Sequence, residues 1–139
     1  DQQPKQINLV RFLNNYMAQQ MGSTDADIFE CTSSFAHVMK FLNATIGDNC
    51  FRTCKQKNGT VVWAKKVNPV VMDAVCTATV FALERLSEDT LAGIDMTAQY
   101  TALMVSPEFT SVTKSRTTDM SNIQKRVQLA ASVLYGIDV

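Results

Sequence analysis

Apolar residues recur every three or four positions through most of this chain, which is the spacing of one face of an α-helix. Capping residues, first-turn prolines and terminal glycines divide the pattern into segments. We expect helices over residues 4–20, 24–46, 68–86, 87–105 and 119–135, with a short helix beginning at Ser106. The pattern therefore predicts a single all-α domain spanning residues 1–139, built as a bundle of about five helices.

The apolar stripes of the first two predicted helices are continuous, and we expect both to face the core. The first stripe consists of Ile7, Val10, Leu13, Tyr16 and Met17. The second consists of Ile28, Cys31, Phe35, Val38, Leu42 and Ile46. At about 1.5 Å per residue the second helix would be about 30 Å long, which is enough to form the spine of the bundle.

Residues 48–67 interrupt the helical period. Asn58-Gly59 favours a tight turn, because both residue types tolerate positive φ angles, and the following Val61-Val62-Trp63 has strand propensity. A lone pair of strands must pack against helices to be stable. We therefore expect a small β-hairpin or an ordered loop near residues 51–66.

The composition is typical of a globular protein, with 46% hydrophobic residues, 19% charged residues and a formal net charge of zero. No run of about 18 apolar residues occurs, so we expect no membrane partner. Four cysteines are few for a disulfide scaffold, which favours a reduced, cytoplasmic setting. Because the chain starts at Asp1 without a signal pattern, we expect an excised part of a longer protein. A mature secreted chain, with sequons at Asn43 and Asn58, is the alternative.

No residue pattern indicates a catalytic or metal site. His37 is the sole histidine and lies in no nucleophile–base motif, so we interpret it as structural. Cys50 and Cys54 lie four residues apart, but a zinc site usually needs a second pair of ligands, which is missing. The five glycines form no phosphate-binding loop. We therefore expect no catalytic residue, no metal and no cofactor in this chain.

One local charge feature stands out between the second and third predicted helices. Residues 52–66 contain no acidic residue and one aromatic residue among their cations: Arg52, Lys55, Lys57, Trp63, Lys65 and Lys66. Basic side chains beside an aromatic ring can grip a phosphate backbone and stack a base. The alternative interpretation is a solvated loop that Trp63 anchors to the helices.

A second, weaker basic group lies near the C-terminus and comprises Lys114, Arg116, Lys125 and Arg126. Arg126 is equally well explained as an interior-facing arginine that ties a loop to the last helix. The sequence leaves both interpretations of this group open.

Four short signatures between the predicted helices carry a resemblance to a known family. Cys50-Phe51-Arg52 follows a long helix, a polar loop comes next, and Asn68 begins a helix of small and apolar residues. Next come a segment ending in Glu108-Phe109, a threonine-rich turn and a helix with an arginine in its first half, matched by Thr113, Thr117, Thr118 and Arg126. In this order the signatures resemble the helical C-terminal region of the GmrSD-type family of type IV restriction proteins.

That family consists of multidomain bacterial proteins, whose N-terminal ParB-like domain uses a nucleotide and often pairs with an HNH nuclease domain. This chain contains neither an Asp-Gly-Gln-Gln-Arg-type run nor an HNH signature, so neither activity carries over. The resemblance implies a non-catalytic accessory module of an anti-phage defence protein. Such a module would scaffold the protein or contact the ParB-like domain of the same or a partner chain.

The resemblance also implies a set of structural positions: Phe51, Arg52, Asn68, Phe109 and Arg126. Phe51 and Arg52 would dock the loop against the second and third helices, and Phe109 would fill the end of the bundle. A nucleic-acid-binding module that contacts DNA through the basic loop, residues 52–66, is the alternative function.

Overall fold

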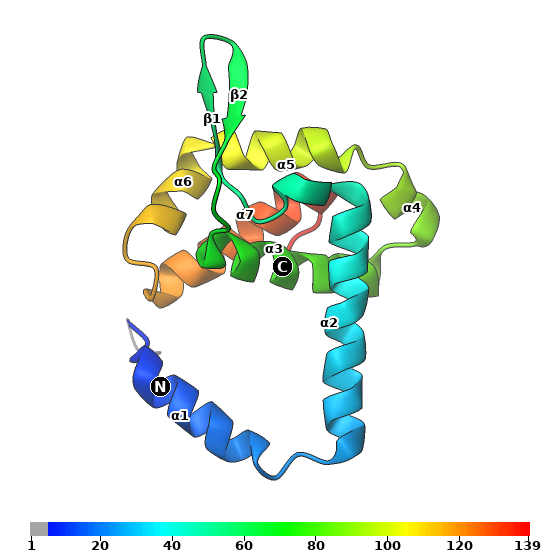
Figure 1. Ribbon diagram of the computed structural model, residues 1–139, viewed down its shortest axis with the longest axis vertical. Coiled ribbons are helices and arrows are strands. Elements are labelled where there is room, and N and C mark those ends of the chain that lie inside the picture. Colours follow the sequence, from blue (N-terminus) through cyan, green and yellow to red (C-terminus); the bar gives the residue numbers. More distant parts are fainter. Residues whose placement is uncertain (1–5) are drawn as a thin grey trace.

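The computed structural model describes residues 6–139 as a mainly helical domain with one two-stranded hairpin (Figure 1). Its α-helices are α1 (Leu9–Gln20), α2 (Asp25–Thr45), α3 (Pro69–Arg85), α4 (Glu88–Ala92), α5 (Met96–Val105), α6 (Pro107–Lys114) and α7 (Met120–Tyr135). A 3-10 turn, η1 (Gly47–Asn49), precedes strands β1 (Cys54–Lys57) and β2 (Thr60–Trp63). Within this described range, no helix has the length and apolar character needed to cross a membrane.

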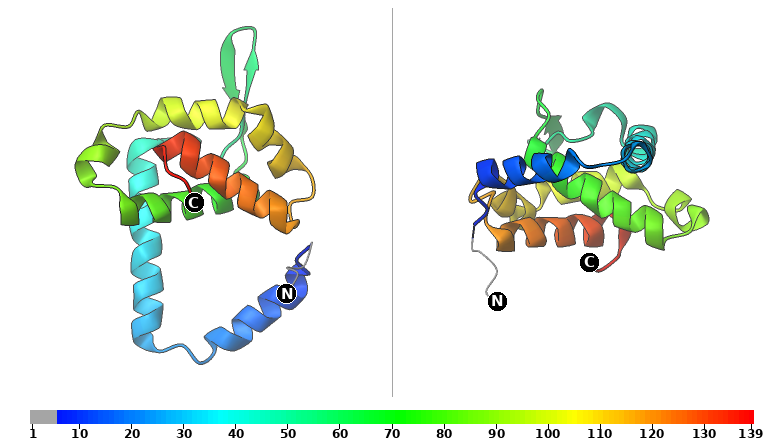
Figure 2. Two further views of the ribbon diagram at one scale, coloured as in Figure 1. Left: turned by 180° about the vertical axis from the view of Figure 1, so that it is seen from behind. Right: turned by 90° about the horizontal axis from the view of Figure 1, so that it is seen from below.

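Helices α3 and α7 form the centre of the body (Figures 1 and 2). Helices α5 and α6 pack on α7, and α2 packs on α3. The side chains that α3 buries are mostly small, and α7 presents Ala130 and Ala131 in return. Small residues allow two helices to approach closely. Bulkier side chains, among them Leu103 of α5 and Phe109 of α6, complete the core as predicted.

The prediction of one helix over residues 87–105 is wrong, because the helix is interrupted between α4 and α5. Gly93 follows α4, and the Asp95 side chain then accepts the N–H of Ala98 at 3.1 Å to start a new helix. An aspartate is more favourable as a helix cap than in a helix interior. This break, with α6 counted separately, gives seven α-helices in residues 6–139 instead of the predicted five or so.

The predicted hairpin is confirmed. Strands β1 and β2 are antiparallel, and their register places Cys54 opposite Trp63 and Lys57 opposite Thr60. The two turn residues both have positive φ angles, 52° at Asn58 and 77° at Gly59. These are the angles that a two-residue hairpin turn of the primed type requires, and Asn-Gly is the sequence that adopts them most readily.

The prediction that the first helix faces the core is wrong. Its predicted start at Pro4 lies outside the described residues, and α1 begins at Leu9 after the capping residue Asn8. Side chains expected in the core are exposed, among them Leu13 at 46% and Met17 at 65%. The chain before α1 is joined to the body by a backbone hydrogen bond of 3.1 Å from the Ile7 N–H to the Thr118 carbonyl.

The apolar stripe of α2 is divided into a buried and an exposed half. Val38 and Leu42 are buried in the body, whereas Ile28 and Phe35 are 55% and 54% exposed. We call residues 8–37 the N-terminal arm; it comprises α1 and the first half of α2, which project from the body (Figure 1). Every residue in the arm is exposed except the half-buried Ser23. A helical period shows that a face is built to be covered, but it does not identify what covers it. In this fold the inner face of α3 is covered by α7 and by the second half of α2.

Candidate functional site

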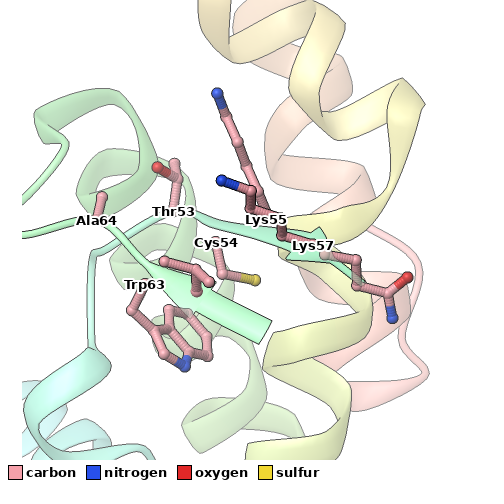
Figure 3. Close-up of a pocket in the computed structure, with 8 residues that line it drawn as sticks. Thr53, Cys54, Lys55, Lys57, Trp63 and Ala64 are labelled. Carbon is pink, nitrogen blue, oxygen red and sulfur yellow. The ribbon is translucent and has the colours of Figure 1, made fainter. Parts of the chain in front are cut away.

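The predicted basic loop folds into the hairpin and the two segments that flank it. Cross-strand partners point to the same face of a sheet, and successive residues point to opposite faces. The register therefore places Lys55 and Lys57 on one face, with Val62 and Thr60. Trp63 lies on the other face beside Cys54, and Figure 3 shows Lys55 and Trp63 extending from opposite sides of the hairpin. The structure does not interleave the lysines with the aromatic ring.

The Trp63 ring anchors the hairpin to the body. It stacks on Tyr100 of α5, with ring centroids 5.8 Å apart and an interplanar angle of 14°. The Tyr100 hydroxyl donates a hydrogen bond of 3.1 Å to the carbonyl of Arg52, at the base of the hairpin. A groove of about 400 Å³ remains beside the indole, lined by residues of both strands (Figure 3).

Phe51 and Arg52 form a tightly held corner between η1 and β1. Phe51 is 6% exposed and adopts a φ angle of 64°, which is unusual for a residue with a side chain. Its carbonyl accepts the N–H of Asn68 at 2.8 Å, and the Asn68 side chain in turn caps α3. The Arg52 side chain is half-buried, so this residue contributes more to the corner than to an exposed cationic surface.

Lys65 and Lys66 are exposed in the segment between β2 and α3. The two basic groups of the sequence also meet at one point: Lys55 of β1 and Lys114 of α6 line the same cavity, of about 130 Å³, together with Asn68 and Phe109. Sequence reasoning did not place these two lysines together, because the approach of β1 to the end of α6 depends on the tertiary fold.

Arg126 faces the interior. It is 5% exposed, and its two terminal nitrogens donate to the Thr117 carbonyl at 2.7 Å and to Oδ2 of Asp73 at 2.8 Å. Arg126 therefore joins α7 to the preceding loop, as one of the two interpretations predicted, and also to α3. It is not part of an exposed basic surface.

Burial raises the pKa of several cysteine thiols and tyrosine hydroxyls in the body. The pKa of the Cys50 thiol rises to about 12, mainly because of burial and secondarily because Cys76 lies nearby. Burial likewise raises the pKa values of Cys54 and Cys76 and of the Tyr100 hydroxyl. The pKa of Tyr135 rises to about 12, again because of burial, although its hydrogen bond with Thr79 opposes the shift. These groups are held in their neutral, poorly nucleophilic forms at neutral pH.

These shifted pKa values predict that the fold loses stability in alkali. Each pKa is higher in the folded chain than in the unfolded chain, so the stabilisation is complete below about pH 8.5 and is lost progressively as the pH rises toward 12. Thermal unfolding from pH 7 to 11 should show a midpoint that falls above pH 9. The Cys50→Ala variant should show a shallower fall, and an unchanged slope would contradict the assignment to this thiol.

The remaining candidates for chemistry are divided between the N-terminal arm and the body. His37 and Cys31 are exposed on the N-terminal arm, whereas Cys50, Cys54 and Cys76 belong to the body. Among residues 6–139, no three His, Cys, Asp or Glu side chains are grouped so that they could hold a metal ion. No family model, curated protein or solved structure matches this chain. The N-terminal arm and the hairpin are therefore the features of this fold that bear on its function.

Proposed function

We propose that this chain is a non-catalytic helical accessory module of a GmrSD-like restriction protein in anti-phage defence, and that it works as a scaffold contacting other protein domains. The observation that supports this function is the uncovered apolar surface of the N-terminal arm. The resemblance of the four signatures supplies the setting, which is a cytoplasmic bacterial protein with a ParB-like domain on the same or a partner chain.

The exposed apolar surface of the arm is larger than the surface that single, scattered apolar residues leave exposed on most proteins. Ten large apolar side chains are between 46% and 90% exposed: Leu9, Val10, Phe12, Leu13, Tyr16, Met17, Met21, Ile28, Phe29 and Phe35. Since a buried aromatic side chain covers about 150–250 Å², the exposed parts together amount to an area on the order of 1,000 Å². The largest apolar patch on a typical monomeric protein is about 300–600 Å². A surface of this size is characteristic of protein–protein contact.

Isothermal titration calorimetry with a separately produced ParB-like domain of a GmrSD-type protein tests the scaffold function. We expect binding with a dissociation constant of about 1–10 µM, in the range of contacts between domains that also exist as separate chains. Absence of binding with both proteins at about 100 µM would contradict the contact with this domain.

The placement of four lysines favours a second candidate function, which is DNA binding. Lys55 and Lys57 share the face of the hairpin that points away from the Trp63–Tyr100 stack, and Lys65 and Lys66 are exposed at its base. This arrangement can contact a phosphate backbone without base stacking. It lacks the interleaved aromatic ring that would support single-strand recognition.

Fluorescence anisotropy with duplex and single-stranded DNA at about 50 and 200 mM salt tests the DNA-binding function. The function requires binding that weakens steeply with salt, and a loss of about tenfold or more in affinity for the Lys65→Glu/Lys66→Glu variant. Lys40→Glu places a charge reversal on an exposed position of α2 and is the control. Equal affinities of all three proteins would contradict a role for the basic loop.

A further inference from the structure

The N-terminal arm is self-complementary, and we infer that a second copy of this chain covers it. This inference rests on the proposed function, since it keeps the arm as a protein contact surface, but it assigns a second copy of this chain, and not the ParB-like domain, to that surface. In the assembly, α1 of each copy packs on the first half of α2 of the other copy about a two-fold axis. Both arms are then covered at once, as the symmetry of such an interface requires.

Helix α1 has the form of a helix built to lie in an apolar groove. Its large apolar residues are related by spacings of three and four positions and share one side of the helix, namely Leu9, Val10, Phe12, Leu13, Tyr16 and Met17. The polar residues Arg11, Asn14 and Asn15 lie on the other side of the helix. Amphipathic helices of this kind bind through residues spaced by three and four positions.

The matching groove lies between α2 and α3, where the stripe of α2 leaves the body. It has a volume of about 390 Å³, and its lining includes Glu30, Cys31, Phe35, Val38, Cys76 and Val80. Phe35 is 54% exposed at this groove, so α1 of the same chain does not fill it. Each chain therefore carries both an uncovered helix and an uncovered groove.

Charges on the arm favour the pairing of α1 with α2 of the other copy. Between residues 8 and 37 the sole lysine or arginine is Arg11, in α1, whereas the acidic residues Asp25, Asp27 and Glu30 lie in the first two turns of α2. Packing α2 on α2 would bring these acidic residues together, whereas α1 contains no acidic residue and presents an apolar side to the groove.

The area also fits a dimer. The exposed apolar surface of one arm is on the order of 1,000 Å², and a stable protein–protein interface of standard size buries about 800 Å² on each partner. Reciprocal packing of two arms therefore supplies enough apolar contact for an interface, without a contribution from the hairpin or from α4 to α7.

Sedimentation equilibrium of the chain alone, from about 1 to 100 µM, tests the inference. We expect a dimer for the wild type. Leu13→Glu places a charge on the apolar side of α1 and should raise the dissociation constant of the dimer about 100-fold or more, because the carboxylate would be buried. Asn15→Glu adds the same charge on the polar side and should leave the dimer intact. Circular dichroism verifies that both variants remain folded.

The outcomes separate this inference from the proposed function. A wild-type chain that stays monomeric but binds the ParB-like domain through the arm overturns the inference and leaves the scaffold function standing. A dimer that Leu13→Glu does not weaken overturns the inference as well, because the contact then lies elsewhere. A monomer that binds no ParB-like domain contradicts both.

Discussion

Replacing Phe109 with alanine should lower the free energy of unfolding by about 4 kcal/mol, which is within the range for truncating a buried phenylalanine. Phe109 is 1% exposed, and α6, which carries it, packs on both α5 and α7. The loss combines the transfer of the ring from water with the cost of the space left behind.

The site around Phe109 has little capacity to collapse after truncation. The start of α6 is fixed by a hydrogen bond of 3.3 Å from the Phe109 N–H to the Ser106 hydroxyl, and the Thr113 hydroxyl donates to the Phe109 carbonyl at 2.8 Å. The ring also borders the cavity of about 130 Å³ that Asn68 and Lys55 line, so the truncated site would join an existing space. Incomplete collapse places the cost toward the upper part of the range.

Urea denaturation of the wild type and the variant measures this loss. Phe29→Ala is the matched control, because Phe29 is 74% exposed and its truncation should cost no more than about 0.5 kcal/mol. Phe29 belongs to the surface assigned to self-association, so both truncations are compared in the Leu13→Glu background. A loss below about 1 kcal/mol for Phe109→Ala would contradict the packing described for α6.

Local chemistry made much of the fold predictable from the sequence. Asn58 and Gly59 define a turn that few other residue pairs adopt, and Asn68 before Pro69 marks the start of α3 through a cap and a first-turn proline. These signals act over two to four residues and do not depend on the rest of the chain. The break at Asp95 uses the same capping chemistry, but it is hidden inside a run whose apolar spacing continues across it.

The N-terminal arm and the basic loop were less predictable, because each depends on what lies next to it. The stripe in α1 has the same period as a core helix, and no local signal distinguishes burial in the chain's own body from burial against another chain. In the loop, Lys55 and Trp63 are near in sequence, yet the strand register places them on opposite faces. The Arg126–Asp73 pair joins residues 53 positions apart, so the sequence could predict the interior arginine but not its partner.

That ion pair leads to the second large effect. Asp73→Ala should destabilise the fold by about 3 kcal/mol, and Arg126→Met should cost only about 1–2 kcal/mol, although Arg126 is the more buried partner. The side chain of Arg126 is 6% exposed and that of Asp73 is 53% exposed. Without Asp73, the guanidinium stays buried with the Thr117 carbonyl as its remaining acceptor among the described residues, because its Nε has no partner there. A buried charge without a counter-ion is strongly destabilising.

Removal of the arginine has a smaller cost because water can hydrate the half-exposed Asp73 carboxylate. Methionine also fills most of the vacated space with apolar atoms, leaving the lost hydrogen bond to Thr117 as the main cost. Urea denaturation of both single variants and of Asp73→Ala/Arg126→Met measures the coupling between the two sites. Once the buried charge is gone, the absence of Asp73 should matter little, so the double variant should be about as stable as Arg126→Met alone. Additive losses, or a larger loss for Arg126→Met than for Asp73→Ala, would mean that the side-chain packing of Arg126, and not the burial of its charge, joins α7 to α3.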